Sequence, residues 1–473
     1  MVVQDPRRSR VSCSPRWGSL LRLSNPNHSC YLKLPALTNV RYENSGDTDR
    51  NKMRKRILAA ATSIVAAMVL GGCSTGATSA KDEPVELTYA MWDTTQEPVF
   101  RKMFDEFSKK NPNITVKTQV LAFGDYWTKR QTEASNGTLP DVFWTNPQNF
   151  PIYASQGILA PVKEGEGVTA DAIPATMRGL YTWNNELYTF PNNRDAIGIW
   201  YNKDLFDAAG VKYPADNWTV SDYAATAKSL ANSGTQVWGT TAPLDSRATY
   251  GATIHNEGGH IINSDATKAE IDSPAAIKGI QFWTDLIAQG SAPTLTQQSE
   301  TDPISLFLSG KAAMHPDGSW MSRSFADSPL GKAGRIGVAP YPKGSAGTNE
   351  TSTSSLGNVM PQKAKHPAEA LKLVQFLGSK EAAKIYADSG IGLTAYPELD
   401  QTFIDHFAST IDVRSFSDAV AKAYPIERSN NTSVWSRKMA TDLTPAFEGK
   451  TSVADAAAKA NNDIQAALDA EKK

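Results

Sequence analysis

Tryptophan side chains stand beside carboxylates and amides where strands of this chain are expected to end. The positions concerned are Trp92 with Asp93, Trp144 with Asn146, Asp195 after Arg194, the turn from Asp317 to Trp320, and Trp435 at the start of a late helix. Aromatic rings pack on the apolar faces of a ligand, and carboxylates or amides bind its hydroxyl groups. This combination suits a polyhydroxylated ligand such as a neutral sugar.

Motifs for metal and nucleotide binding are incomplete. His255, Glu257 and His260 contain the H-x-E element of a zinc deaminase, but no P-C-x-x-C follows. The histidine spacing also differs from H-E-x-x-H. Gly449-Lys450-Thr451 matches the end of a phosphate-binding loop, yet Thr444 stands where that loop requires glycine. We therefore expect no metal, no cofactor and no ATP site.

The aromatic and polar residues follow segments with strand and helix patterns. Residues 85–92 alternate like a strand, residues 98–107 carry apolar groups at helical spacing, and residues 114–120 alternate again. A second helix over 126–135 and a short apolar strand over 141–144 follow. This β-α-β-α-β order predicts a parallel, doubly wound sheet, in which ligands bind beyond the carboxyl ends of the strands.

The α/β pattern continues to the end of the chain. Residues 199–201 are expected to form a strand, and a helix is expected around 204–209. Amphipathic helices are expected over 275–289 and 368–377, and an alanine-rich helix over 453–470. Since no internal repeat and no long linker separates these elements, we expect discontinuous domains with several chain crossings.

Length and charge exclude several classes of protein. The chain has 473 residues, which favours two or more domains. Its 40% apolar and 21% charged residues exclude a collagenous or wholly disordered chain. Residues 1–72 hold 12 basic and 4 acidic groups, whereas the remainder holds 36 basic and 45 acidic groups. The acidic body argues against nucleic acid or an anionic membrane as its ligand.

A targeting segment begins at Met53. The basic residues 54–56 precede an uncharged, mostly apolar run over residues 57–70, which is too short to cross a membrane and has the length of a signal-peptide core. We expect residues 53–72 to be a signal peptide and translation to start at Met53. Residues 1–52 would then be a mis-assigned extension; the alternative is a genuine disordered one.

Cys73 directly follows this segment. The run Leu70-Gly71-Gly72-Cys73 resembles the lipobox of bacterial lipoproteins, in which the cysteine is diacylated and becomes the first residue. A chance cysteine after an ordinary signal is the alternative. Residues 73–84 would form a polar tether, and two acyl chains suffice for stable membrane attachment. Because no cysteine follows Cys73, the body has no disulfide and no thiol nucleophile.

Several segments, taken in chain order, resemble the family 1 extracellular solute-binding proteins of ABC importers, the group that contains the maltose-binding protein. The resemblance covers residues 85–470 and implies an α/β fold of the type II periplasmic-binding-protein kind, in which hinge strands join two discontinuous lobes around a ligand cleft. The matching segments are residues 137–144, 200–206, 310–314 with 318–320, 339–342 and 365–370.

The resemblance also implies the lobes and the ligand-binding residues. We expect lobe 1 to comprise residues 85–195 and 336–379, and lobe 2 to comprise residues 196–335 and 380–473. By resemblance, Trp320 and Trp435 match aromatic positions that stack on sugar, and the family pattern weakens around 245–260. The expected ligand-binding residues are Trp92, Asp93, Trp144, Asn146, Asp195, Tyr250, Glu257, Asp317, Trp320 and Trp435.

The resemblance implies a lipid-anchored receptor on the outer face of the cell membrane. We expect a monomer that delivers a mono- or oligosaccharide to the transmembrane subunits of an ABC permease, contacts the membrane through its lipid alone, and has no catalytic residues. An extracellular glycosidase, which needs two carboxyl groups about 5–9 Å apart, is the rival hypothesis. A cell-wall adhesion lipoprotein is a third, but it leaves the tryptophan-rich strand ends unexplained. The order of the matching segments favours the receptor.

Overall fold

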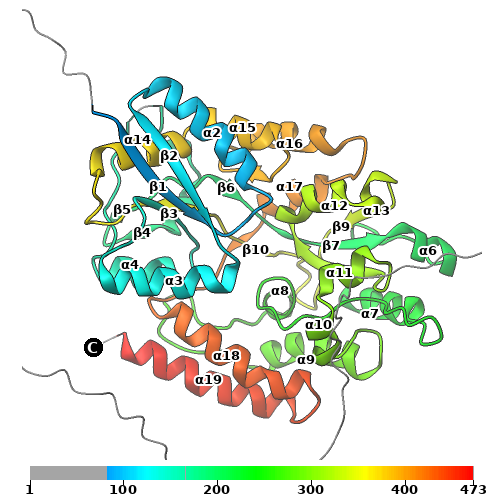
Figure 1. Ribbon diagram of the computed structural model, residues 1–473. Coiled ribbons are helices and arrows are strands. Elements are labelled where there is room, and N and C mark those ends of the chain that lie inside the picture. The colour runs from blue at the N-terminus through cyan, green and yellow to red at the C-terminus, as the bar shows by residue number, and fades with distance from the viewer. Residues whose placement is uncertain (1–82, 166, 472–473) are drawn as a thin grey trace, which may run out of the picture. The chain divides into compact units, whose positions relative to one another are not determined.

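The structure is a computed structural model, which describes residues 83–165 and 167–471. The expected signal peptide, Cys73 and nearly all of the tether therefore lie outside the described residues. Within those residues, no helix is both long and apolar enough to span a membrane. Strands and helices alternate over residues 85–145, as the sequence predicts, and runs of several strands or several helices follow (Figure 1).

Four strands form the first sheet, in the order β11-β3-β1-β2. β1 pairs in parallel with β2, with Val85 opposite Ile114, and in parallel with β3, with Tyr89 opposite Val142. The predicted parallel β-α-β-α-β unit is therefore confirmed, and β11 adds an antiparallel edge. The strands are β1 (Val85–Met91), β2 (Ile114–Val120), β3 (Val142–Thr145) and β11 (Gly357–Val359).

Helices cover both faces of this sheet, with α2 and α14 on one side and α3 and α4 on the other (Figure 1). α2 buries Phe100, Met103 and Phe107 because their spacing of three and four residues places them on one helix face. The elements are α2 (Glu97–Lys110), α3 (Phe123–Asn136), α4 (Phe150–Ser155), α5 (Ala175–Gly179), β4 (Thr182–Trp183), β5 (Glu186–Leu187), α14 (Pro367–Leu377) and α15 (Lys380–Asp388).

The second sheet has the order β8-β7-β9 and is antiparallel throughout. Its central strand alternates between two cores, because side chains of a strand point to opposite faces in turn. Ile197 and Ile199 pack into one core, whereas Trp200 packs on the other side against Phe325 and Phe416. The strands are β7 (Ile197–Asn202), β8 (Met314–Gly318) and β9 (Ile336–Ala339).

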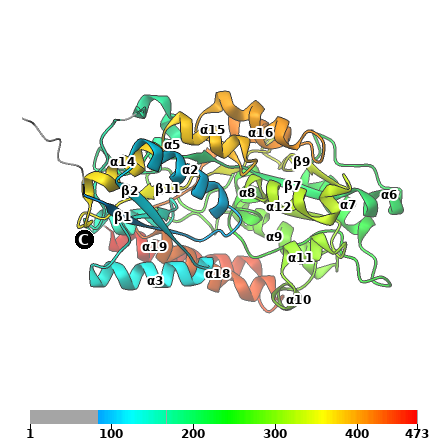
Figure 2. The same cartoon turned by 45° about the horizontal axis from the view of Figure 1, so that its top comes forward.

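Helices surround the second sheet, and α18 and α19 pack together as a C-terminal pair (Figures 1 and 2). The helices expected over 275–289, 368–377 and 453–470 are α9, α14 and α19. The elements are α6 (Lys203–Ala209), α7 (Val220–Leu230), α8 (Tyr250–Asn256), α9 (Pro274–Ala288), α10 (Leu295–Glu300), α11 (Pro303–Leu308), α12 (Ser322–Asp327), α13 (Pro329–Lys332), α16 (Asp400–Phe407), α17 (Arg414–Ala421), α18 (Thr432–Phe447) and α19 (Val453–Ala470).

The buried residues change between the core of the first sheet and those of the second between Phe190 and Ala196, between Tyr341 and Val359, and between Tyr396 and Phe403. Leu393, just before the last of these segments, already belongs to a core of the second sheet. These points differ from the expected lobe bounds. Residues 336–339 pair with β7 and pack with the second sheet, because β9 continues that sheet. Residues 382–396 largely pack with the first sheet.

Short strand pairs join the crossing segments. β6 (Asn193–Arg194) pairs with β12 (Leu393–Thr394), and β10 (Ser352–Thr353) pairs with β13 (Tyr424–Pro425). Arg194 also forms a buried ion pair with Asp400. Burial lowers the pKa of Arg194 and raises the pKa of Asp400, because it disfavours the charged form of each group.

Candidate functional site

A cleft of about 640 Å³ is lined from both sheets and lies beyond the carboxyl ends of β1 and β3. Its volume is that of a small-molecule site. The first side contributes Trp92, Asp93, Gln96, Phe123, Asn146 and Gln148. The second contributes Pro243, Asp245, Ser246, Arg247, Ala248, Asp302, Pro303, Ile304, His315, Pro316, Asp317 and Trp320. The crossing segments contribute Asn193, Asp195, Ser354 and Leu356.

The structure brings six of the ten expected residues together in this cleft. They come from the ends of β1 and β3, from the first crossing, and from the end of β8 with the turn after it, which are far apart in the sequence. The six are Trp92, Asp93, Asn146, Asp195, Asp317 and Trp320.

Trp92 and Asp93 are placed by the end of β1. The ring of Trp92 meets the ring of Phe123 edge-on, with centroids 5.5 Å apart. The Oδ1 atom of Asp93 accepts the backbone N–H of Thr95 at 2.7 Å, and its Oδ2 atom accepts the side-chain amide of Gln96 at 2.9 Å. These bonds hold the carboxylate at the start of α2, beside an aromatic wall.

Asn146 is placed by the end of β3. Its Oδ1 atom accepts the backbone N–H of Asn149 at 3.0 Å and the side-chain amide of Asn149 at 2.9 Å. The carbonyl oxygen of Asn146 is thus committed to the turn, so its amide N–H groups are what it can offer to a ligand.

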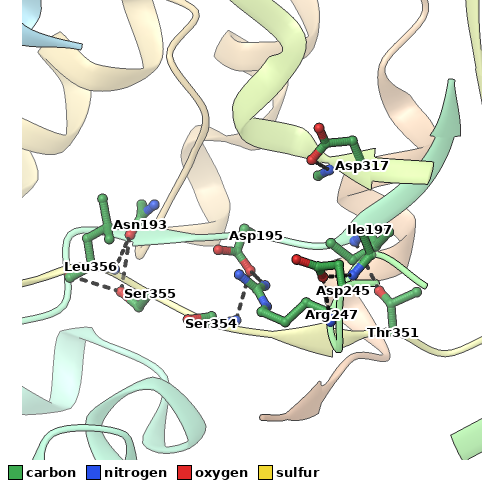
Figure 3. A network of polar contacts seen from close by, with 12 residues as sticks. Asn193, Asp195, Ile197, Asp245, Arg247, Asp317, Thr351, Ser354, Ser355 and Leu356 are labelled. Atoms are coloured by element: carbon green, nitrogen blue, oxygen red, sulfur yellow. Dashed lines mark hydrogen bonds and ion pairs between the residues drawn. The ribbon is translucent and has the colours of Figure 1, made fainter. Parts of the chain in front are cut away.

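Asp195 and Arg247 form an ion pair that joins the first crossing to the second side of the cleft (Figure 3). The Nη2 atom of Arg247 donates to Asp195 Oδ1 at 2.5 Å, and the backbone N–H of Ser354 donates to the same oxygen at 2.8 Å. The guanidinium carbon of Arg247 lies 5.0 Å from the ring centroid of Trp320, which is a cation–π distance. Arg247 therefore links the carboxylate to the aromatic ring.

Trp320 is half-buried, and its ring lies against its own turn. A Cβ atom added at Gly318 would stand 2.1 Å from Cζ3 of Trp320, so the indole occupies the space that any side chain at Gly318 would need. The φ of Gly318 is −88°, an angle open to every L-residue. Gly318 is therefore needed for the close approach of the ring and not for its backbone conformation.

Asp317 is held by its neighbours on β8. Its Oδ1 atom accepts the backbone N–H of Gly318 at 2.6 Å, and its Oδ2 atom lies 3.2 Å from Nε2 of His315. The Nδ1 atom of His315 bonds the hydroxyl of Thr241 at 2.7 Å. Both ring nitrogens of this buried histidine are thus engaged.

Four expected residues lie outside the cleft lining. Trp144 lies on β3, which is buried along its whole length, and its ring packs against Trp92 and Phe100 with centroids 4.9 and 5.1 Å away. Trp435 is buried in the second core, and its Nε1 donates to Ser429 Oγ at 2.9 Å. It lines a small cavity of about 40 Å³ that shares Gln148 and Ser246 with the lining of the cleft.

Tyr250 and Glu257 belong to α8 and its C-terminal end. Tyr250 is buried, and this burial raises the pKa of its phenol. Glu257 forms an ion pair with Lys278 at 2.5 Å and accepts a hydrogen bond from the hydroxyl of Ser345. Both side chains hold α8 in place in this structure.

Sequence reasoning missed Phe123 and Arg247. Phe123 is 53% exposed, an unusual state for a large apolar side chain, and it follows β2 closely, as Trp92 follows β1. Its position just after a predicted strand could have identified Phe123 as a candidate ligand-binding residue. Arg247 stands in an irregular loop before α8, where no periodic pattern marks it.

The histidines of the incomplete metal motif lie in another cavity, of about 1020 Å³. His255 stacks on Tyr424 with centroids 3.7 Å apart, and His260 bonds Glu427 at 2.8 Å. Among the described residues, no group of three or more potential metal ligands is present. The Arg428 guanidinium in the same cavity donates to the carbonyl of Gly179.

Comparison with known proteins gives a match to one family model. The family described as bacterial extracellular solute-binding protein matches residues 92–384. A binding protein of Brucella abortus (strain 2308) is 26% identical over 353 residues, which cover 72% of this chain and 82% of the relative. The arabinooligosaccharide-binding protein of Bacillus subtilis (strain 168) is 24% identical over 330 residues, which cover 67% and 75%.

The fold also matches a solved structure. An ABC substrate-binding protein from Listeria monocytogenes, in complex with cycloalternan, superposes with a TM-score of 0.74 at 26% identity. The match covers 81% of this chain and 99% of the other. Together with the family match, this likeness confirms the predicted two-lobed α/β fold of the type II periplasmic-binding-protein kind.

Proposed function

Because this chain belongs to the family of bacterial extracellular solute-binding proteins, we propose that it is a carbohydrate receptor that delivers a sugar, preferably an oligosaccharide, to an ABC import permease. The choice of ligand rests on one observation: the cleft combines Trp92, Phe123 and Trp320 with carboxylates from both sides and with amides from the first side. Such a lining contacts both the apolar faces and the hydroxyl groups of a sugar. The names of the relatives support the same ligand class.

The receptor binds its sugar without cleaving it. Members of this family are solute-binding proteins, which supports the expectation that the chain is not an enzyme. Glycoside hydrolysis needs a proton-donating carboxylic acid and a second carboxylate on the opposite side of the bond. In this cleft Asp195 is paired with Arg247, and Asp317 lies beside His315. These two carboxylates thus already have a cationic or imidazole neighbour.

Closure of the two lobes provides the transport signal. Since residues of both lobes line the cleft, a sugar makes its full set of contacts only when the lobes are closed, and its binding energy shifts the population toward that state. We propose that the three crossing segments, near residues 190–196, 341–359 and 396–403, form the hinge. The closed receptor then docks on the transmembrane subunits of the permease.

Cys73 is the proposed attachment point. Diacylation there would hold a monomeric receptor on the outer face of the cell membrane, with residues 73–84 as the tether. Membership of this family supports an extracellular location, and the lipobox-like run that ends at Cys73 supports the lipid anchor. Mass spectrometry of the membrane-extracted protein should find a diacylated N-terminal cysteine and no peptide from residues 1–52.

A titration tests the proposed function. Malto-, cello-, xylo- and arabino-oligosaccharides are titrated into the protein by calorimetry, and the sugar is then recovered and separated by chromatography. At least one neutral oligosaccharide should bind and be recovered unchanged. Turnover of the sugar would favour the glycosidase, and the absence of binding by every saccharide tested, acidic ones included, would refute the receptor.

A further inference from the structure

We propose that the cleft selects against anionic glycans, because Asp195 masks the guanidinium of Arg247. The inference rests on the proposed function and concerns the charge of the ligand. The described lining residues include five aspartates and one arginine, which give a formal charge of −4, and they include no lysine. A ligand carboxylate or phosphate would therefore enter a strongly negative site.

Arg247 is already committed on two sides. Its Nη2 atom donates to Asp195 at 2.5 Å, and its planar group lies over Trp320 at 5.0 Å. The side chains of Arg247 and Asp195 are 17% and 10% exposed, so little water screens the pair. The ion pair neutralises the guanidinium, and the stack on Trp320 fixes its orientation. An anionic ligand would have to compete with the Asp195 carboxylate, which is part of the protein chain and therefore always present beside Arg247.

Other hydrogen-bond donors near the Asp195–Arg247 ion pair already have acceptors. The backbone N–H of Ser354 donates to Asp195, and both ring nitrogens of His315 are bonded, one to the Thr241 hydroxyl and one to Asp317. These contacts leave no free N–H on the Ser354 backbone or on the His315 ring, whereas the buried Nε of Arg247 has no hydrogen-bond partner among the described residues. Hydroxyl groups differ from anions here, because they can donate to carboxylates as well as accept.

Three further aspartates of the lining accept hydrogen bonds from neutral donors. Asp93 accepts hydrogen bonds from backbone N–H groups and from the amide of Gln96. Asp245 and Asp302 each accept two backbone N–H groups through Oδ1. All these donors are neutral, so they fix the carboxylates without cancelling their charge. The negative potential is thus built into the turns that form the cleft.

A matched pair of ligands tests the selection by charge. The tightest neutral oligosaccharide is compared with the same sugar oxidised at its primary hydroxyls to uronate, together with oligogalacturonides, by calorimetry at low and high salt. The acidic sugars should bind at least about a hundredfold more weakly, and salt should narrow the gap by screening the repulsion. An acidic glycan that binds more tightly than its neutral counterpart would overturn the inference and leave the receptor function intact.

Two isosteric variants test the role of Asp195. Asp195→Asn keeps an oxygen for the N–H of Ser354 but frees Arg247, so the ratio of neutral to acidic affinity should fall by about tenfold or more. Asp302→Asn removes the same charge from the lining without freeing a guanidinium, and should lower the ratio less. Melting temperatures verify that both variants are folded. Equal changes in the two variants, or an unchanged ratio in Asp195→Asn, would refute the masking by Asp195.

Discussion

Replacing Gly318 by alanine should weaken sugar binding by moving Trp320. The added Cβ would stand 2.1 Å from the ring, whereas ordinary contact begins at 3.4 Å, so the indole must shift by at least about 1.3 Å, the difference of these distances. The backbone can accept alanine, because the φ of Gly318 is −88°. The perturbation therefore acts on the ring and leaves the turn intact.

The expected loss follows from the contacts of Trp320. Stacking of an aromatic ring on a sugar contributes about 1–3 kcal/mol, so loss of the aligned ring should cost roughly 5- to 150-fold in affinity. Stability should change far less, because Gly→Ala reduces the entropy of the unfolded chain and offsets part of the local repacking. Trp320→Ala should cause a comparable loss of affinity.

A double-mutant cycle separates this mechanism from a general disturbance of the cleft. Affinity is measured by calorimetry for Gly318→Ala, Trp320→Ala and the double variant, and melting temperature is measured for each. Gly179→Ala is the matched control, since a Cβ there would meet no atom within 4 Å. If Gly318 acts through Trp320, the double variant should bind like Trp320→Ala. Independent, additive losses would refute the reasoning, as would unchanged affinity in Gly318→Ala.

Three further expectations concern other parts of the molecule. Phe123→Ala should lower oligosaccharide affinity several-fold with little change in melting temperature, because this ring is exposed at the cleft; equal affinity by calorimetry would exclude the ring from the site. Trp435→Ala should lower the free energy of unfolding in urea by about 3–5 kcal/mol, since the ring is buried in the second core; a stable variant with lost binding would return Trp435 to the ligand site. Thr219→Ala should cost about 1 kcal/mol at pH 7 by loss of the N-cap of α7. The hydroxyl of Thr219 lowers the pKa of Asp222, so this pair stabilises the fold above pH 4 and the difference between variants should shrink as the pH falls further; a difference that grows in urea titrations at pH 3 would contradict this.

The sequence predicted the first sheet well because its signals are local. Residues 85–91 and 114–120 alternate, and helical spacing separates them, so the parallel pairing of β1 and β2 follows from the order of elements. The same order placed Asp93 and Asn146 at one edge of the sheet, where both line the cleft. Residues that directly follow a strand could thus be found from the pattern alone.

Residues inside elements were harder to place. Trp144 lies on a strand that is buried on both faces. Trp435 lies on a helix, and the sequence allows its ring to face either the cleft or the core. Spacing does not fix which of these holds, because it depends on packing between segments far apart in the chain. Arg247 shows the same limit, since its role arises from contacts with Asp195 and Trp320.

The lobe bounds depend equally on long-range pairing. Residues 336–339 form a short apolar strand that could extend either sheet, and the structure pairs it with β7 in the second. The chain then returns to the first sheet only near β11. Tertiary packing determines which sheet such a strand joins, and the local strand propensity of the sequence does not indicate it.

A crystal structure with the tightest-binding oligosaccharide tests the central claim most directly. We predict one sugar ring against Trp320 and further contacts with Trp92 or Phe123, so that the ligand joins both lobes across the cleft, with its glycosidic bonds intact. A sugar bound instead in the cavity of His255 and His260, or contacting one lobe alone, would contradict this account.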